Sequence, residues 1–576
     1  MLKKVFGHLS ENKFLTAQLT LGTLAWSLVM LKSGHVYSFG MGFWGANGHD
    51  GIWHVALINS LSRATLQMPV FAGSYIKNYH IGFDLIVAAV HKITSIPVIS
   101  LYFQIVPPII AFLIGLLAYK FVYIWKKSKI QALVAVFFIY FSGSFGWVVT
   151  YLRTGSFDGE SLFWSQQALS TLINPPYALS LVIIFFGLYY LAKENGSLPK
   201  NRTIIILSLL FGILAQIKIY AAVLILSALF FAGVWGFFKR GSNSFLIIFL
   251  IASAVSLFVI LPTYNFTGAG LIFQPFWFLE SMVSDPDRLF WPRMASALYN
   301  YKITGNIVKE TLAYGLSFAI FLVGNLGIRI ISFPYLGRKI LAFKKLETLE
   351  IMIFSVILLG LFIPMFFIQK GNSWNSIQFF YYSLVFLSLV TGLSVGEYLE
   401  NMLKRRLRKD QYVGKSKVVL IVVVIVLFCV PTTIATLRHY LPSRPPSMIS
   451  NEELTALYFL RSLPDGVTLT FPFDRDYANY INPPPPKPLY LYESTAYVSA
   501  LSNKISYLED EVNLEITGYP WKERVEEIYN NFGNVSYLRS IGINYLYIPD
   551  FKNFSHKDEM QPLTIYNKDN IAIYKL

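Results

Sequence analysis

The sequence predicts an α-helical polytopic membrane protein with about eleven transmembrane helices and a small C-terminal α/β domain. The first observation behind this prediction is composition: 55% of the 576 residues are hydrophobic and 14% are charged, whereas soluble domains are about 25% charged. The second is a series of long apolar segments, and the third is a change of charge near residue 438. Most of the chain is therefore expected to be solvated by lipid.

A helix needs about 20 mainly apolar residues to cross a bilayer, and the apolar segments of the sequence come near that length. They lie at residues 14–34, 99–125, 131–151, 176–193, 203–217, 219–238, 244–264, 310–333, 349–368, 376–398 and 418–437. The first follows three lysines and is longer than the apolar part of a signal peptide. We interpret it as an uncleaved span.

Basic residues predict the orientation, because loops rich in Lys and Arg stay on the cytoplasmic side. Such loops lie at 126–129, 193–202, 239–243, 334–348 and 404–417. Their alternation places the N-terminus in the cytoplasm and residues after 438 outside, in a multi-pass protein of the cell membrane. Residues 1–437 contain 35 Lys/Arg against 15 Asp/Glu, and residues 438–576 contain 13 against 17. The basic excess thus belongs to the membrane part, so we expect no nucleic acid among the partners.

The predicted domains follow from this charge pattern. Residues 1–437 form a transmembrane domain with two long outer loops, at 35–98 and 265–309, and residues 438–576 form a soluble extracytoplasmic α/β domain. In that domain Glu452–Leu463, capped by Ser450 or Asn451, Trp521–Phe532 and Ser536–Ile541 are predicted helices. Short β-like runs lie at Gly466–Pro472, Ala496–Leu501, Asn544–Ile548 and Ile571–Leu576. The one cysteine, Cys429, excludes an intrachain disulfide.

Candidate chemistry gathers in the first outer loop, around Gly48-His49-Asp50-Gly51-Ile52-Trp53-His54. Asp50 suits a general base, and its glycine neighbours leave room for a substrate. It suits equally the cap of a helix, since Gly51–Leu66 has the spacing of an amphipathic helix lying at the membrane interface. His54 and His80 are candidate substrate-binding residues. His80 and Asp84 are four apart, so on one helix they would share a face.

Further candidates lie in later outer loops. Asp158 and Glu160 flank a glycine, and carboxylate oxygens are the ligands that Mn²⁺ and Mg²⁺ prefer; a solvated acidic turn is the alternative. Cations that could hold a phosphate are Arg153, Lys218, Arg288, Arg293 and Lys370, of which arginine is the better bidentate ligand. The alternative is that these are ordinary basic side chains at the membrane interface, with their charged ends extended toward water.

The order of these parts resembles the GT-C-fold glycosyltransferases, polytopic enzymes that use polyprenyl-linked sugars. The likeness is carried by the first span, the outer loop that opens with Asp50, the segment Tyr79-His80-Ile81-Gly82-Phe83 and the outer C-terminal domain. It implies that Asp50 is a base or metal ligand and that Asp158 and Glu160 help to hold a divalent cation, Mn²⁺ or Mg²⁺. Two features depart from the pattern: Gly51 follows Asp50 where protein mannosyltransferases have Asp-Glu, and residues 438–576 lack the Trp-Trp-Asp motif of oligosaccharyltransferases.

The resemblance implies an enzyme that moves a sugar from a polyprenyl-phosphate-type donor to a glycan, lipid or protein acceptor on the outer face. Two other functions fit a chain of this kind. A transporter or flippase for a lipid-linked glycan would also need many spans, although no inverted repeat or mid-span polar site is evident. A non-catalytic cell-envelope assembly protein would use the tyrosines of the outer domain to bind a polymer.

Overall fold

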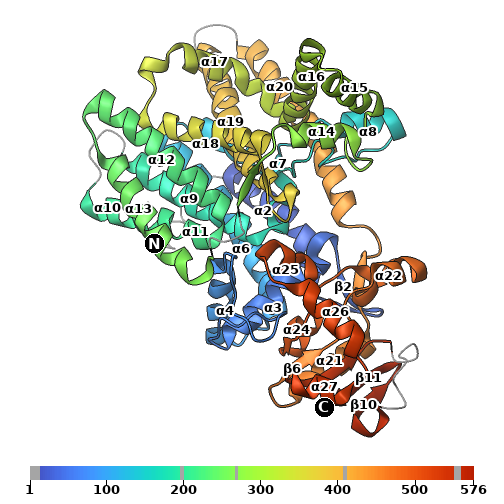
Figure 1. Ribbon diagram of the computed structural model, residues 1–576. Helices are drawn as coiled ribbons and strands as arrows, with labels where there is room; N and C mark the ends of the chain where they lie inside the picture. Colours follow the sequence, from blue (N-terminus) through green and yellow to red (C-terminus); the bar gives the residue numbers. More distant parts are fainter. Residues whose placement is uncertain (1–12, 195–199, 266–269, 407–410, 551–559) are drawn as a thin grey trace. The chain divides into compact units, whose positions relative to one another are not determined.

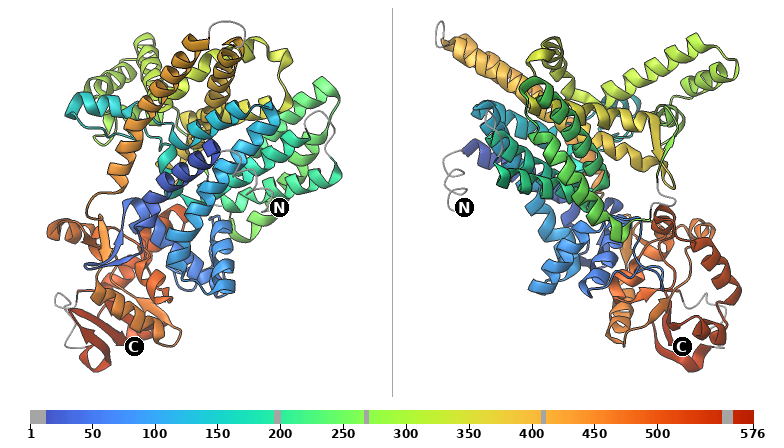
Figure 2. Two further views of the ribbon diagram at one scale, coloured as in Figure 1. Left: turned by 180° about the vertical axis from the view of Figure 1, so that it is seen from behind. Right: turned by 60° about the vertical axis from the view of Figure 1, so that its left-hand side comes forward.

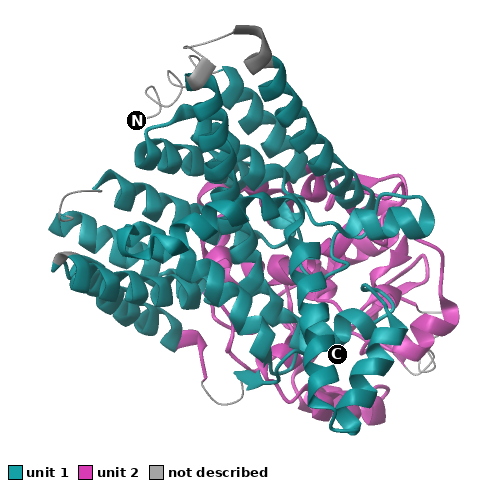
Figure 3. Cartoon of the chain, turned by 90° about the horizontal axis from the view of Figure 1, so that it is seen from above, with its two compact units in different colours: residues 1–27, 108–261, 270–439 teal, residues 28–107, 262–269, 440–576 magenta. Residues whose placement is uncertain are grey.

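The computed structural model of the protein describes residues 13–194, 200–265, 270–406, 411–550 and 560–576 (Figure 1). Residues 1–12 and 407–410, which supply part of the charge pattern used to predict the orientation, lie outside the described residues. The chain forms two compact units, coloured separately in Figure 3. Unit 1 is Met1–Ser27, Pro108–Leu261 and Gly270–His439; unit 2 is Leu28–Pro107, Pro262–Ala269 and Tyr440–Leu576.

Long apolar helices confirm the predicted membrane class. In the part of the chain that the structure describes, nine helical segments are long and apolar enough to cross a bilayer. They are Lys13–Leu31, Val98–Lys126, Pro175–Lys193, Ile219–Lys239, Ser244–Thr263, Ile307–Leu341, Thr348–Phe366, Ser373–Lys404 and Ser416–Tyr440. A bent pair, Lys129–Phe141 and Gly146–Thr154, would make a tenth. The remaining predicted span, 203–217, coincides with the shorter apolar helix Asn201–Ile217.

Unit 1 is built by α-helices, a two-stranded antiparallel sheet and short 3₁₀ turns (Figure 1). The first helices are α2 (Lys13–Leu31), α6 (Val106–Lys126), α7 (Lys129–Phe141), α8 (Gly146–Thr154), α9 (Pro175–Lys193), α10 (Asn201–Gly212), α11 (Leu214–Ile217), α12 (Ile219–Arg240) and α13 (Ser244–Ile260). Then follow α14 (Trp277–Ser284), α15 (Pro292–Ile303), α16 (Ile307–Leu326), α17 (Phe333–Leu341), α18 (Thr348–Phe366), α19 (Gln378–Arg406) and α20 (Gln411–Tyr440). Strands β3 (Leu271–Phe273) and β4 (Phe367–Gln369) pair antiparallel.

The predicted span 131–151 is bent by 46° between α7 and α8. Gly143 lies in the break against α20, where a Cβ atom would come within 2.2 Å of the Thr432 Cβ. Arg329 then supplies donors to the carbonyls that the helix end leaves open, since its guanidinium donates to Ser142 O at 3.2 Å and Gly143 O at 3.4 Å. A residue with a side chain at 143 would therefore displace α20.

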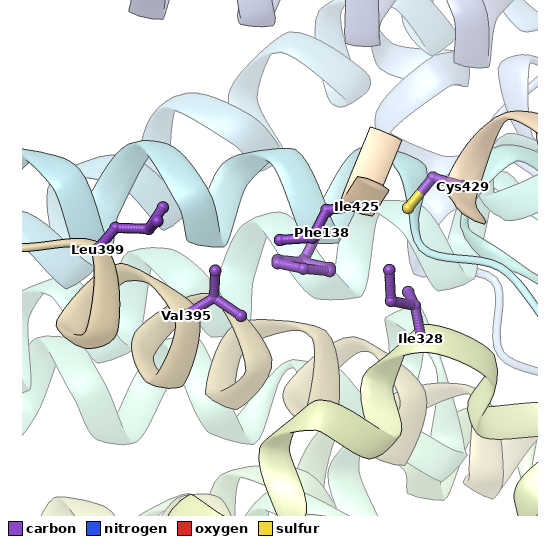
Figure 4. Close-up of a cluster of buried hydrophobic side chains, with 6 residues drawn as sticks. All are labelled: Phe138, Ile328, Val395, Leu399, Ile425 and Cys429. Atoms are coloured by element: carbon purple, nitrogen blue, oxygen red, sulfur yellow. The ribbon is translucent and has the colours of Figure 1, made fainter. Parts of the chain in front are cut away.

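The packing of unit 1 includes a cluster contributed by α7, the turn η5 (Gly327–Ser332), α19 and α20 (Figure 4). Its buried members are Phe138, Ile328, Val395, Leu399, Ile425 and Cys429. Dispersion contacts among such side chains are individually small and collectively large. The single cysteine therefore lies in an apolar core.

Unit 2 combines two sheets with short helices. The strands are β1 (Val36–Tyr37), β2 (Gly40–Phe43), β5 (Ser447–Ile449), β6 (Val467–Leu469), β7 (Lys487–Pro488), β8 (Ile505–Ser506), β9 (Ile543–Ile548), β10 (Thr564–Lys568) and β11 (Ile571–Lys575). The first sheet has the order β1-β2-β5-β7, in which β5 and β7 are parallel and the other pairs are antiparallel. The second sheet has the order β10-β11-β9-β6-β8, in which β9-β6 and β6-β8 are parallel and the other pairs are antiparallel. Figure 2 shows the second sheet, orange to red, from two further sides.

The helices of unit 2 come from both ends of the chain. They are α3 (Asp50–Ser62), α4 (Gly82–Thr94), α5 (Val98–Ser100), the π-helical turn η2 (Leu101–Ile105), α21 (Asn451–Ser462), α22 (Arg475–Ile481), α23 (Leu489–Tyr492), α24 (Tyr497–Ser502), α25 (Glu511–Thr517), α26 (Trp521–Asn531) and α27 (Val535–Ser540). The predicted helices 452–463, 521–532 and 536–541 are confirmed, as are strands within 466–472, 543–548 and 571–576. Of the two predicted caps of the first helix, Ser450 and Asn451, the structure has Ser450, in a capping box with Glu453.

Two local predictions for unit 2 are wrong. Ala496–Leu501 forms α24 and not a strand, because the buried Glu509 carboxylate accepts the N–H groups of Val498 and Ser499 at the helix start. The helix predicted over Gly51–Leu66 exists as α3, but residues 51–61 are buried on every side. It is thus a core helix, packed against α4 and α24, and not an amphipathic helix at a lipid surface.

Candidate functional site

Asp50 begins α3, and glycines on either side of His49 and Asp50 set its position. A Cβ atom on Gly48 would lie 2.2 Å from the Ser447 Oγ, and one on Gly51 would lie 2.8 Å from the Phe103 ring. The glycines therefore let neighbouring segments of unit 2 pack closely, rather than leaving room for a substrate. The cap position of α3 is His49, with no capping hydrogen bond from its side chain. Asp50 occupies the first turn, where a negative charge interacts favourably with the helix dipole.

His49 lies between two carboxylates of unit 2. Its Nδ1 is 2.9 Å from Oδ1 of Asp50, and its Nε2 is 3.5 Å from Oδ1 of Asp510. The Asp50 side chain is 57% exposed, whereas those of His49 and Asp510 are 12% and 0% exposed. Burial by itself lowers the pKa of His49, but the charges and hydrogen bonds of Asp510 and Asp50 raise that pKa well above its ordinary value. These carboxylates thus favour the charged form of His49, whose Nδ1 is bonded to the exposed carboxylate of Asp50.

Asp510 is fixed from the opposite side by α25. Its carboxylate caps that helix and accepts hydrogen bonds from the backbone N–H and the side-chain amide of Asn513. The residue has φ +55°, a left-handed conformation that an aspartate adopts with strain and that clusters at functional sites. Sequence reasoning missed Asp510, although the run of three acidic residues Glu509-Asp510-Glu511 was a usable signal.

His54 is placed deeper in unit 2, on α3. Its Nδ1 lies 2.7 Å from Oδ1 of Asp84 on α4, with both side chains buried. The imidazole stacks on Tyr102 at 5.6 Å. A neighbouring phenol, Tyr79, is held neutral, because burial and then the Asp84 charge raise its pKa well above the ordinary value. His54 is therefore arranged as a packed, hydrogen-bonded pair with Asp84.

His80 precedes α4, which begins at Gly82. His80 and Asp84 therefore do not share a helical face, and that part of the prediction is wrong. The His80 ring lies against Tyr79, with centroids 4.8 Å apart. Its predicted role in substrate binding stays a prediction.

Asp158 and Glu160 lie in unit 1 with different surroundings. Asp158 is exposed and its Oδ1 accepts the N–H of Gly159 at 2.8 Å. Glu160 is 5% exposed, and its Oε1 accepts hydrogen bonds from the Gln167 N–H and the Ser170 hydroxyl. Burial raises the pKa of Glu160 to about 7. Among the described residues no group of three or more His, Cys, Asp or Glu side chains could hold a metal ion, and the predicted role of Asp158 and Glu160 as ligands of Mn²⁺ or Mg²⁺ stays a prediction.

The candidate cations of unit 1 have separate environments. Arg153 on α8 donates to the Phe290 carbonyl at 3.4 Å, which brings it to the segment that carries Arg288. The Arg288 guanidinium lies over the Trp164 ring at 4.0 Å and 3.3 Å from an oxygen of Asp287. Arg293, at the start of α15, and Lys370 are exposed.

Lys218 is the buried member of the set, at the junction of α11 and α12. It is 5% exposed, and its Nζ donates to the Asn174 side chain at 3.4 Å. The Tyr220 ring lies 5.4 Å from the same ammonium. Lys218 is thus tied to unit 1 by polar and ring contacts of its own.

Comparison with protein-family models and with curated proteins gives no match. Among solved structures, the chain is similar to the apo form of an oligosaccharyltransferase from Archaeoglobus fulgidus, with 15% identity and a TM-score of 0.49 over 93% of this chain and 70% of that one. The same enzyme in complex with zinc and sulfate gives 15% identity and a TM-score of 0.47, over 93% and 68%. Its activity and its zinc are properties of that protein.

Proposed function

We propose that this protein is a membrane glycosyltransferase that moves a sugar from a polyprenyl-phosphate-type donor to an acceptor on the outer face of the cell membrane. The observation that carries the proposal is the environment of Asp50. Its carboxylate is exposed, bonded to the buried imidazolium of His49 and backed by Asp510. A base for transfer to a hydroxyl or amide needs such a fixed carboxylate that a substrate can reach.

In the proposed reaction Asp50 acts in one step, as the general base. Its carboxylate takes the proton of the acceptor group while that group's oxygen or nitrogen bonds to the anomeric carbon of the sugar. The bond from that carbon to the phosphate oxygen breaks, and its electron pair leaves with the polyprenyl phosphate. His49 is a positioning residue, because its Nδ1–H fixes the carboxylate to which it is bonded.

The departing phosphate needs positive charge, because its negative charge develops as the bond breaks. Arg288 and Arg153 are the candidates that the structure brings to one segment of unit 1. Arg293 and Lys218 remain proposed ligands for the donor. No step is assigned to a metal, and the roles of Asp158, Glu160 and a Mn²⁺ or Mg²⁺ ion stay predictions.

The proposed setting follows from the charge of the loops. A cytoplasmic N-terminus and an extracytoplasmic C-terminal domain, from residue 438 onward, would present Asp50 to substrates on the outer face. The donor would be a polyprenyl-linked sugar in the lipid, and the acceptor a glycan, lipid or protein.

The test is transfer by the purified full-length chain, supplied with a panel of radiolabelled polyprenyl-phosphate sugars in lipid nanodiscs. We expect release of the lipid phosphate with one donor, and a fall on the order of 10² to 10⁴ in Asp50→Asn, the worth of a positioned base. The matched control is Asp476→Asn, an exposed aspartate on α22, which should retain full activity.

Two results would count against the proposal. Equal release by the wild type and Asp50→Asn would remove Asp50 from the reaction. Movement of an intact lipid-linked glycan across vesicles, without loss of its phosphate, would support the transporter instead.

A further inference from the structure

A cavity of about 240 Å³ lies within the C-terminal part of unit 2. Its wall is formed by residues of α22, α23, α24, α25 and α26 and by the end of β9, several of which are labelled in Figure 1. Asp510, which faces His49, also lines it. The cavity therefore adjoins the carboxylate pair described above, while being built almost entirely from the last 110 residues.

The charge of this wall has one sign. Six carboxylates line the cavity: Asp474, Glu493, Glu509, Asp510, Glu511 and Asp550. No Lys, Arg or His is among the described residues that line it. An opposite charge nearby favours the ionised form of a carboxyl group, so a bound cation would stabilise these acids as carboxylates.

Three of these six carboxylates already accept hydrogen bonds from side chains. Glu509 accepts from Val498, Ser499 and Ser506. Asp510 accepts from Asn513, and Asp550 accepts from Tyr477 and Asn570. These three acids therefore shape the cavity and are not the first candidates for binding a ligand.

Glu511 differs from them. The residue is 8% exposed, and its Oε1 receives one long bond from the Phe473 N–H at 3.4 Å. Its Oε2 is buried and has no hydrogen-bond partner among the described residues. A buried acceptor without a donor destabilises the folded state, so a donor from a ligand would stabilise it. Glu493, which is exposed, also lines the cavity and supplies a second carboxylate.

The rest of the wall suits a cation better than a sugar. Tyr477, Tyr490, Tyr497 and Tyr529 line the cavity, and tyrosine ring faces attract ammonium and guanidinium groups. A sugar hydroxyl both donates and accepts, so it needs donors from the protein too. Beyond hydroxyl groups, the side chains of this wall offer acceptors only, since no Asn, Gln, Lys or Arg is among the described residues that line it.

We propose that this cavity binds an organic cation, an alkylammonium or guanidinium group, held by the carboxylates of Glu511 and Glu493 and by the faces of the tyrosines. The binding site lies beside Asp510 and therefore beside the candidate base. The proposal concerns binding and does not depend on sugar transfer.

The experiment uses the full-length protein in nanodiscs and measures Kd by titration with saturation-transfer difference NMR. The probe is Nα-acetyl-lysinamide, and its matched control is Nα-acetyl-norleucinamide, which lacks the ε-ammonium. We expect the lysine derivative to bind and the norleucine derivative to bind at least ten-fold more weakly. Glu511→Gln keeps the side-chain volume and should raise the Kd of the lysine derivative at least ten-fold.

The control variant is Glu526→Gln, an exposed residue of α26 that does not line the cavity, and its Kd should equal that of the wild type. If Glu511→Gln fails to fold, the exposed Glu493→Gln provides the same readout. Equal binding of both probes, unchanged binding in Glu511→Gln or Glu493→Gln, or no binding by the wild type would each overturn the proposal. So would preferential binding of methyl α-glucopyranoside, which would identify a site for neutral sugars.

Discussion

The Nε2 atom of His49 lies 3.5 Å from Oδ1 of Asp510, although the two residues come from opposite ends of the chain. Because the pKa of His49 in the folded protein is raised above 6.5, its pairing stabilises the fold fully below about pH 6.5 and loses that contribution as the pH rises through the raised value. We expect the melting temperature of the wild type to exceed that of His49→Gln most at pH 6, and the difference to shrink at higher pH. A difference that grows with pH would contradict the assignment of charge.

Two substitutions of Asp50 separate its effect on stability from its effect on activity. Asp50→Ala removes a charge from the first turn of α3 and a bond to His49, which together are worth about 1 kcal/mol. Asp50→Asn keeps the volume and should melt nearer to the wild type. Transfer assays should show both variants equally inactive. Activity in Asp50→Asn alone would mean that the residue positions His49 and is not a base.

Glu160 gives a second pH prediction. Its pKa is about 7 in the folded protein against a reference value of 4.5, so the folded state favours the protonated acid. This group's contribution to stability is therefore greatest below pH 4.5 and is lost as the pH rises through 7. Glu160→Gln should lose that part of the pH dependence and melt higher than the wild type at pH 8. Melting curves at pH 5 and pH 8 check this; a glutamine variant that melts lower at pH 8 would point to an ionised, paired carboxylate.

Arg329 should be among the most sensitive positions of unit 1. It is 1% exposed and donates to Ser142 O, Gly143 O, the Gln167 side chain and the Ser388 hydroxyl. Arg329→Met leaves these acceptors buried without donors, at a cost of roughly 3 kcal/mol or more. Arg329→Lys should recover part of the loss. Melting in detergent compares the two, with Arg338→Met, an exposed site, as the control.

The C-terminal segment is expected to depend on residues 28–107. β5 pairs with β2 through Met41 and Ile449, and the Asn59 side chain donates to the Ala500 carbonyl at 2.7 Å. A fragment starting at residue 445 would expose these edges. It should melt less cooperatively than the same fragment mixed with a peptide that spans residues 28–107. Identical cooperative melts with and without that peptide would show that the segment folds alone.

The sequence predicted the features that depend on local pattern. Apolar length located the helices of the membrane part, and the predicted cap at Ser450 or Asn451 located the start of α21. The sequence prediction failed where contacts with residues distant in the chain determine the local structure. Glu509 turns residues 497–502 into a helix, and the packing of α3 by other parts of unit 2 hides a face that spacing alone assigned to lipid.

The candidate site likewise combines a residue that local pattern predicts with one that only distant contacts reveal. Asp50 was evident from its neighbours, but the partner that completes its surroundings, Asp510, lies at the far end of the sequence. No periodicity or motif links the two positions. The cavity beside Asp510 was equally hidden, since its acids are spread over residues 474–550 and only the fold brings them together.

The pairing of β2 with β5 imposes an order on biosynthesis. About 400 residues separate β2, which ends at Phe43, from β5, which begins at Ser447, and at roughly 5–20 residues per second they take from about 20 to about 80 seconds to synthesise. Throughout that interval the edge of β2 that β5 will occupy has no strand beside it, and unpaired strand edges recruit other chains. The sheet that contains β2 and β5 can therefore form only after the last membrane helix has been synthesised. A chain truncated before β5 would keep an unpaired strand edge that can associate with other chains.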